Sequence, residues 1–319
     1  MKLSEIKQIL ETQLEHNLKS QLPKHPIADV YHYSVIPPGK LFRPFLAIAI
    51  LHDFAAGEKT LELNSPHSFF CSAIEMHHAY TLVHDDLPCM DNDEYRRGRP
   101  TVHKAFGEWK ALLAGDGLLN ASYGLLSKIK SPELPRLLRF ITWALGPKGL
   151  IQGQVLDLSE EMKKDFTTLL MTHEYKTARL IQVALYGSYM LIDYKKKSPY
   201  SENRCLVDLF KLGLHTGVTF QLLDDLTELA DAQISEHERS VNPWFYFPDE
   251  SLKRIHKGLE NIKNITEKHQ MEAFHLVMKD YFGKIHRILN DNIENVAGHQ
   301  KKSARDLVPM MSLLERLSQ

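Results

Sequence analysis

Apolar residues recur every three or four positions along most of the chain. Near the amino terminus, Leu3, Ile6, Leu10, Leu14 and Leu18 fall at these steps, which is the spacing of one face of an α-helix. The same spacing predicts further helices at about 40–55, 66–87, 108–128, 163–191, 202–232, 250–268, 270–296 and 303–317. No stretch shows the alternating pattern between turn signals that is typical of a strand. The pattern therefore predicts an all-α protein.

Short breaks rather than long linkers separate these helices. The breaks contain proline or glycine and fall at Pro37-Pro38-Gly39, Pro88, 98–100, Gly146-Pro147, Ser198-Pro199 and 243–248. A chain of 319 residues could form two domains. However, the sequence has no linker long enough to separate two cores, and no repeat or low-complexity tract. We therefore predict a single domain over residues 1–319, in which long helices surround a central cavity.

The charge balance and the cysteines bear on partners and compartment. Forty acidic residues against 39 basic ones give a net charge of -1, so the chain has no overall attraction for nucleic acid or an anionic membrane. Its longest apolar run, at 45–51, is far shorter than the roughly 20 residues of a membrane-spanning helix. Cys71, Cys89 and Cys205 lack the spacing of a disulfide framework or a zinc site. We therefore expect a cytoplasmic protein without stable membrane insertion.

A first acidic cluster closes the helix predicted at 66–87. Asp85 and Asp86 stand at the end of its apolar part, and Pro88 then breaks it, because proline cannot continue a helix. The chain can thus turn and bring Asp91 back toward Asp85. Such carboxylates suit Mg²⁺, which binds a few of them together with water and substrate phosphates. The cluster therefore predicts part of a magnesium site.

Two arginines, Arg96 and Arg97, follow this cluster directly. Guanidinium groups bind phosphate oxygens in bidentate fashion, so acids followed by arginines indicate a diphosphate bridged by metal. The simpler alternative is a solvated acidic loop that is neutralised by its own arginines. A second acidic cluster argues against that alternative.

The second cluster lies on the helix predicted at 202–232. Asp224 and Glu228 are one helical turn apart, where like charges repel unless a cation lies between them. Asp225 is the third acid of this cluster, and leucines surround it at Leu222, Leu223, Leu226 and Leu229. Two acidic patches on apolar helices are hard to explain without bound cations.

These residues resemble the trans-isoprenyl diphosphate synthases, the family that includes bacterial farnesyl and geranylgeranyl diphosphate synthases. The resemblance is closest over 75–119, EMHHAYTLVHDDLPCMDNDEYRRGRPTVHKAFGEWKALLAGDGLL. Weaker matches in the family's order are GKLFRP at 39–44, GQVLDL at 153–158, KTARLI at 176–181 and FQLLDD at 220–225. The resemblance spans about 39–246. It implies an isoprenoid-synthase-type barrel of antiparallel helices, usually a homodimer, with the two acidic clusters facing each other across the cavity.

The resemblance also implies roles for individual residues. The Mg²⁺ ligands would be Asp85, Asp91 and Asp224, and they would be supported by Asp86, Asp225 and Glu228. The groups that bind the allylic diphosphate would be Arg96 and Lys176. Those that bind isopentenyl diphosphate would be Lys40, Arg43, His78 and Arg97. The oxygen dipoles that face the allylic cation would come from Thr177 and Gln221.

The implied reaction joins isopentenyl diphosphate to dimethylallyl or geranyl diphosphate. Tyr80 lies five positions before Asp85, about 7.5 Å along a helix, where its ring would form a floor below the growing chain. An aromatic residue at this position accompanies a C15 product in the family, so we predict farnesyl diphosphate, with geranylgeranyl diphosphate next. If Tyr80 is simply part of the core, its replacement by alanine would leave product length unchanged.

The sequence departs from the family pattern at several positions. Leu41 replaces the usual Arg, Ala178 the usual Gly and Glu228 the usual Asp. The loop after Asp225 is shortened to ADAQISEHERSVNPW, in which Arg239 would replace a substrate-binding lysine. A non-catalytic or regulatory subunit of a heteromeric synthase therefore stays open as an alternative. A terpene cyclase is disfavoured, because the second cluster lacks that class's metal motif.

Overall fold

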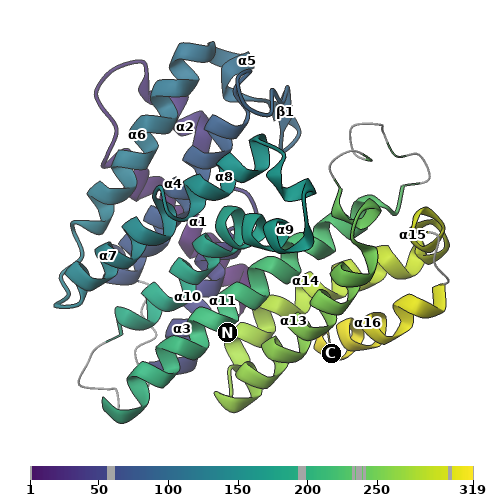
Figure 1. Cartoon of the computed structure of the whole chain (residues 1–319). Coiled ribbons are helices and arrows are strands. Elements are labelled where there is room, and N and C mark those ends of the chain that lie inside the picture. The colour runs from purple at the N-terminus through teal and green to yellow at the C-terminus, as the bar shows by residue number, and fades with distance from the viewer. Residues whose placement is uncertain are drawn as a thin grey trace. The chain divides into compact units, whose positions relative to one another are not determined.

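The computed structural model describes residues 2–55, 62–192, 199–231, 234, 239, 242–300 and 304–318 (Figure 1). Its α-helices are α1 (Leu3–Lys19), α2 (Ala28–Val35), α3 (Phe42–Phe54), α4 (Pro66–Asp85), α5 (Val102–Phe106), α6 (Glu108–Leu126), α7 (Leu134–Leu145), α8 (Leu150–Leu158), α9 (Phe166–His173), α10 (Arg179–Met190), α11 (Pro199–Glu228), α13 (Pro248–Lys268), α14 (Glu272–Asp291), α15 (Ile293–His299) and α16 (Ala304–Leu317). The predicted all-α class is confirmed.

The chain divides into two compact units. The first comprises Met1–Leu138 and Gly187–Lys196, and the second comprises Arg139–Tyr186 and Lys197–Gln319. Each unit is built mainly from helices. The single domain over 1–319 stays a prediction.

Helix α4 is the central helix of the first unit and carries the first acidic cluster at its end. It packs against α1, α3 and α6 and is buried nearly all round, as expected of a helix that is apolar on every side. The Ser65 side chain accepts a hydrogen bond from the Ser68 N–H, and Pro66 occupies the first turn. The capped N-terminus and the burial of α4 thus hold Asp85 in a defined position.

The second unit contains α11, which carries the second acidic cluster. This helix packs against α13 and α14, and α16 packs against both of these. Leu222, Leu223, Leu226 and Leu229 are fully buried, so one side of the acidic segment is held in the core. The carboxylates therefore sit at the edge of an apolar layer.

The helix expected at 163–191 is interrupted, and this expectation was wrong in detail. Helix α9 starts at Phe166, where the Asp165 side chain accepts a hydrogen bond from the Thr168 N–H at 2.8 Å. A π-helical turn, η2 (Glu174–Ala178), then separates α9 from α10. Apolar periodicity does not reveal such a turn, which is often found at functional sites.

Other elements were also missed. Helices α2, α5 and α8 are short and begin or end beside breakers, so they hold too few apolar positions to establish a period. Helix α7 was also not predicted, although Leu134, Leu137, Leu138 and Ile141 have helical spacing. Two-residue strands β1 (Tyr95–Arg96) and β2 (Arg99–Pro100) pair antiparallel, although no strand was predicted. Within the described ranges, no helix is both long enough and apolar enough to cross a membrane.

Candidate active site

The first acidic cluster is built by a tight turn after α4. The Asp91 N–H donates to the Asp85 carbonyl oxygen at 2.9 Å, and the Asn92 N–H donates to the Leu87 carbonyl oxygen at 3.1 Å. Asn92 has a φ of 55°, a left-handed conformation that asparagine adopts more readily than most residues. The turn thus returns Asp91 to the end of the helix, as the position of Pro88 predicted.

Arg96 is held by carboxylates of the same region. Its Nε and Nη2 lie 2.9 and 2.6 Å from Oδ1 of the buried Asp86, and Nη2 lies 2.7 Å from Asp93 Oδ2. Burial lowers the pKa of Arg96, but the hydrogen bonds and charge of Asp86 outweigh it and raise that pKa above its ordinary value. Arg96 therefore positions Asp86, while its predicted contact with the allylic diphosphate stays a prediction.

Arg97 occupies the turn between β1 and β2. Arg97 and Gly98 have φ values of 55° and 77°, the positive pair that a two-residue hairpin needs. A non-glycine residue in this region is strained, and such strain is often retained at functional sites. Arg99 fastens the hairpin: its guanidinium lies 4.1 Å from the Tyr33 ring centroid and donates to the carbonyl oxygens of Ile36 and Tyr33.

The Arg97 side chain fills the space beside Gly39. A Cβ added at Gly39 would lie 2.7 Å from Arg97 Cζ, so a side chain at position 39 would displace the Arg97 guanidinium. A small crevice of about 30 Å³ opens beside this hairpin, and its lining includes Asp86, Arg96 and Arg97. The predicted site for isopentenyl diphosphate thus has one arginine in a defined place.

A basic region is formed by Arg97 together with Arg43 and His78. The carboxylate of Glu75 offsets part of its positive charge. Burial lowers the pKa of Arg43 to about 10, against the opposing charge of Glu75. Burial also lowers the pKa of His78 well below its ordinary value, and Arg43 and Arg97 add to this effect. His78 is therefore neutral at physiological pH. Among the described residues, the buried Nε of Arg43 finds no hydrogen-bond partner.

The turn before α3 contains Lys40 and Leu41. Lys40 is exposed, whereas the Leu41 side chain is buried and its backbone has a φ of 52°. The leucine that replaces the family's usual arginine is thus part of the core. Lys40 is one of the two lysines assigned to diphosphate binding. Because it is exposed, a ligand can reach it from solvent.

The second acidic cluster belongs to a hydrogen-bonded chain of side chains. Thr177 Oγ1 donates to Gln221 Oε1 at 3.0 Å, and Gln221 Nε2 donates to Asp225 Oδ1 at 2.8 Å. His173 Nε2 lies 3.9 Å from the other oxygen of Asp225. Two residues that the sequence assigned to catalysis are thereby brought together on the π-helical turn and α11.

Lys176 forms an ion pair with Asp157 of α8. This pairing depends on Gly153, where an added Cβ would lie 2.3 Å from the Lys176 backbone nitrogen, so α8 can approach η2 closely. The sequence reasoning quoted GQVLDL but assigned Asp157 no role. Glu75 and His173 were also missed, although each lies three residues before a predicted site residue.

Tyr80 is buried on α4, below Asp85 along the helix. Its ring meets His77 edge-on at 4.6 Å and His84 at 5.8 Å between centroids. Burial raises the pKa of its phenol, so Tyr80 is a neutral, aromatic group. Its effect on product length stays a prediction.

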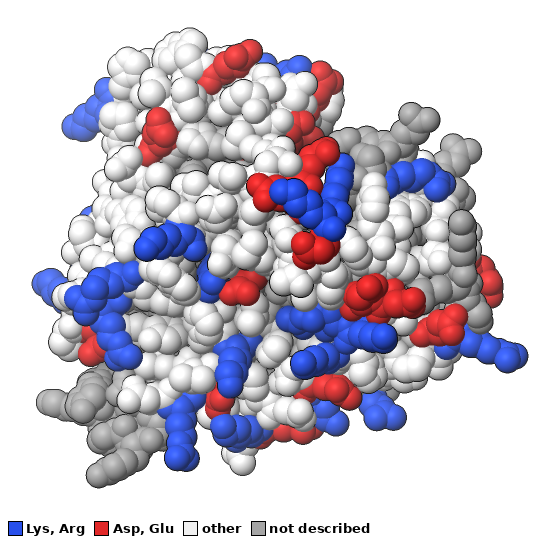
Figure 2. All heavy atoms as spheres, in the orientation of Figure 1, with Lys and Arg blue, Asp and Glu red and all other residues white. Residues whose placement is uncertain are grey.

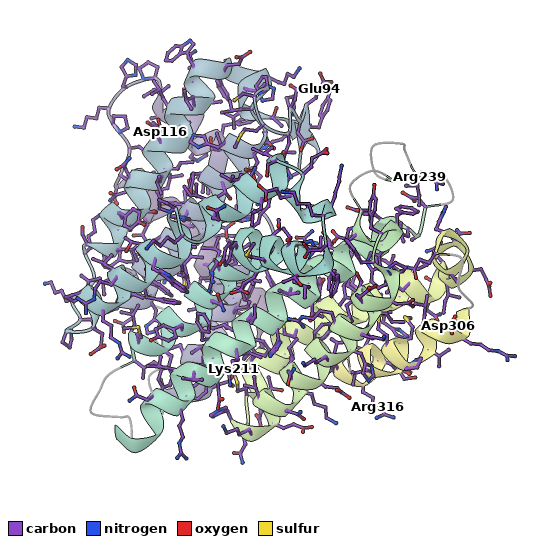
Figure 3. The ribbon with its side chains drawn as sticks, viewed as in Figure 1. Glu94, Asp116, Lys211, Arg239, Asp306 and Arg316 are labelled. Atoms are coloured by element: carbon purple, nitrogen blue, oxygen red, sulfur yellow. The ribbon has the colours of Figure 1, made fainter. Side chains whose placement is uncertain are left out.

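Arg239 follows α11 in the sequence, and its side chain stacks on Phe245. Its guanidinium carbon lies 5.4 Å from the Phe245 ring centroid, a cation–π distance. Figure 3 labels Arg239. The other residues of the shortened loop at 232–233, 235–238 and 240–241 lie outside the described residues. On the face shown in Figure 2, acidic and basic side chains are interspersed, which fits the net charge of -1.

The carboxylates fit magnesium in chemical type. Within the described ranges, no group of three or more His, Cys, Asp or Glu side chains is arranged to hold a metal ion. A hard cation bound by Asp85 and Asp91 would therefore complete its shell with water or phosphate oxygens, as Mg²⁺ does. That Asp224 shares this task stays a prediction.

Comparisons with known proteins agree with this chemistry. The family model described as polyprenyl synthetase matches residues 24–238. The farnesyl diphosphate synthase of Geobacillus stearothermophilus is 34% identical over 237 residues, which cover 72% of this chain and 75% of that protein. The geranylgeranyl diphosphate synthase of Cyanophora paradoxa is 32% identical over 276 residues, covering 82% and 87%. The geranyltransferase of Helicobacter pylori, in a crystal structure with magnesium and isoprenyl diphosphate, superposes with a TM-score of 0.69 at 26% identity, covering 86% and 97%.

Proposed function

The chain belongs to the polyprenyl synthetase family, and from this premise we propose that it condenses isopentenyl diphosphate with dimethylallyl or geranyl diphosphate. It is a short-chain prenyl diphosphate synthase, with farnesyl diphosphate as its main product and geranylgeranyl diphosphate next. The observation that carries the proposal lies in the first unit. There the acidic turn of Asp85 and Asp91 adjoins a basic region whose buried Arg43 Nε has no partner among the described residues.

The basic region supplies the binding of isopentenyl diphosphate. Arg43 and Arg97 provide charge and N–H donors, and neutral His78 can donate one N–H to a phosphate oxygen. Lys40 adds an ammonium group from the exposed turn. Isopentenyl diphosphate keeps its own diphosphate group in the product. The site therefore has to bind this group but forms no covalent bond to it.

The second unit supplies the groups that face the reacting allylic carbon. Because the Thr177 hydroxyl donates to Gln221 and the Gln221 amide donates to Asp225, the hydroxyl hydrogen and one of the two amide hydrogens are committed. The remaining lone pairs of both oxygens are the groups available to stabilise a cation. Lys176 and Arg96 bind the departing diphosphate, and Arg239 extends this role.

Magnesium fits the acidic clusters. Bound Mg²⁺ supplies stabilisation of negative charge on the leaving diphosphate, and the residues that would hold it are Asp85, Asp91 and Asp224. The isopentenyl double bond attacks the allylic carbon, and a proton is then lost, which the released diphosphate accepts. Apolar surroundings exclude water, which would otherwise trap the cation as an alcohol.

We also propose that the protein is a homodimer in the cytoplasm. Trp109, Leu112 and Leu113 on α6 are 61%, 48% and 49% exposed, and large apolar residues clustered on one helix end support contact with a second copy. The three cysteines are free thiols, which suits a reducing compartment. Light scattering after gel filtration, with Trp109→Glu as the disruptive variant, tests the dimer.

Product analysis tests the activity. The protein is incubated with geranyl diphosphate, isopentenyl diphosphate and Mg²⁺, and the products are separated by chromatography. We expect a C15 diphosphate that disappears when the metal is chelated. A folded protein that binds Mg²⁺ and diphosphate but elongates nothing would instead indicate a non-catalytic partner subunit.

A further inference from the structure

Asn242, just beyond the second acidic cluster, is bound to the end of α11. Its amide nitrogen lies 2.7 Å from the carbonyl oxygen of Asp225 and 3.2 Å from the carboxylate Oε2 of Glu228. The residue is 2% exposed. One buried amide thus donates to the backbone of one cluster member and to the side chain of another.

The other end of Asn242 is fixed as well. Its Oδ1 accepts a hydrogen bond from the Trp244 N–H at 3.0 Å, and the fully buried Trp244 donates its indole N–H to the Leu222 carbonyl oxygen at 2.8 Å. The segment from Asn242 to Trp244 is therefore attached to α11 at three places, over its last two turns. Asn242 cannot rotate without breaking these contacts.

This attachment satisfies a helix end that carries functional groups. The last carbonyl groups of a helix lack intrahelical partners, and the Asp225 carbonyl is one of them in α11. Asp225 is also the acceptor for Gln221, which in turn accepts from Thr177. A shift at Asn242 would therefore reach both the acidic cluster and the oxygens assigned to the allylic cation.

The length of Glu228 is matched to this arrangement. Aspartate, the usual residue of the family at this position, is one methylene shorter, and its carboxylate would withdraw by about 1.5 Å from a bond that is already 3.2 Å long. Glu228→Asp therefore weakens the contact with Asn242 while it keeps the negative charge.

We propose that Asn242 is a positioning residue for the second acidic cluster, which it holds through its hydrogen bonds to the Asp225 carbonyl oxygen and the Glu228 carboxylate. The inference rests on the proposed function, since it concerns the same site. It does not depend on which product the enzyme makes.

The test compares Asn242→Ala and Glu228→Asp with the wild type. We measure kcat and KM for geranyl diphosphate and the Mg²⁺ concentration that gives half-maximal rate. Glu228→Asp and Asn242→Ala should each lose about tenfold in kcat/KM, the loss of one hydrogen bond to a charged group, and should require more Mg²⁺.

A matched control comes from the same neighbourhood. Asn295 is exposed and donates its amide to the Ala230 carbonyl oxygen at 3.1 Å, just past α11, without touching a carboxylate in that bond. Asn295→Ala should leave the rate and the Mg²⁺ requirement unchanged. If Asn242→Ala retains the wild-type rate and Mg²⁺ requirement, the proposal is overturned.

Two outcomes have different meanings: a variant that does not fold, and a wild type that makes no product. If Asn242→Ala does not fold, Glu228→Asp decides, because it leaves Asn242 and Trp244 in place, and a wild-type rate and Mg²⁺ requirement for this variant then overturn the proposal. If the wild type makes no product, the proposed function fails, and thermal shifts with Mg²⁺ and inorganic pyrophosphate replace the rates. The positioning role then requires smaller shifts for Asn242→Ala and Glu228→Asp than for the wild type, and shifts equal to the wild type reject it.

Discussion

The backbone N–H of Asp91 donates to the backbone carbonyl of Asp85 across 2.9 Å, although six positions separate the two residues. This bond closes the turn that follows α4 and keeps both carboxylates at one end of a buried helix. The turn therefore presents two hard oxygen donors from a rigid support, which is what a magnesium ligand pair requires.

Asp85→Asn and Asp91→Asn should each reduce activity by at least about 100-fold, since loss of even an outer-shell partner costs 10–100-fold at metal sites. Excess Mg²⁺ should recover part of the rate. Initial rates over a Mg²⁺ titration measure this. Glu94→Gln removes an exposed carboxylate paired with Lys104 in the same region (Figure 3) and should behave as wild type. A wild-type rate for both Asp variants would contradict their assignment.

Gly39→Ala should raise the KM for isopentenyl diphosphate, because the new Cβ would displace the Arg97 guanidinium, which lies 2.7 Å from that position. The expected increase is about tenfold, corresponding to one weakened charge-assisted hydrogen bond of about 1.4 kcal/mol. Steady-state kinetics with each substrate varied in turn distinguishes the two KM values. Gly298→Ala, where an added Cβ meets no atom within 4 Å, is the control. An unchanged KM would remove Arg97 from the binding site.

Tyr80→Ala should lengthen the product to C20 or beyond, because it removes a ring that stands below Asp85 and between His77 and His84. Tyr80→Phe keeps the ring and should keep the C15 product. Chromatography of the products from both variants gives the answer. Loss of a buried aromatic ring also destabilises by about 3–5 kcal/mol, so the assays are run at low temperature. Unchanged product length in a folded Tyr80→Ala protein would reduce Tyr80 to a core residue.

Mild acid should destabilise the fold through His77. Burial lowers the pKa of this imidazole to about 3, against an ordinary value of about 6.5. Between these values the unfolded chain binds a proton that the folded protein does not, so the free energy of unfolding decreases as the pH falls below about 6.5, by about 1.4 kcal/mol per pH unit.

His77→Gln should therefore lose about 2 kcal/mol less than the wild type between pH 7 and pH 5, measured by urea unfolding at both pH values. Comparing each protein with itself cancels the constant effect of the substitution, including the loss of the contact between His77 Nδ1 and Ser122 Oγ at 3.4 Å. His16→Gln, at an exposed position of α1, is the control. Identical pH dependence in wild type and His77→Gln would mean that His77 is protonated in the folded protein.

Features that depend on neighbouring positions in the chain were determined by the sequence itself. Apolar spacing identified the long helices, because one buried face imposes its period on the residues that form it. The return of Asp91 was predictable as well, since Pro88 must interrupt α4 wherever the helix packs. Short helices and the π-helical turn η2 lie below the length or outside the period that such reasoning can detect.

The partners of the charged groups were decided by the tertiary structure. Lys176 pairs with Asp157 because Gly153 lets two backbones approach, and Asn242 reaches Asp225 and Glu228 across a chain reversal. Spacing along the chain cannot predict these contacts. A side chain's electrostatic partner depends on which helices pack together and how closely, and that is set by the summed burial of residues far apart in sequence.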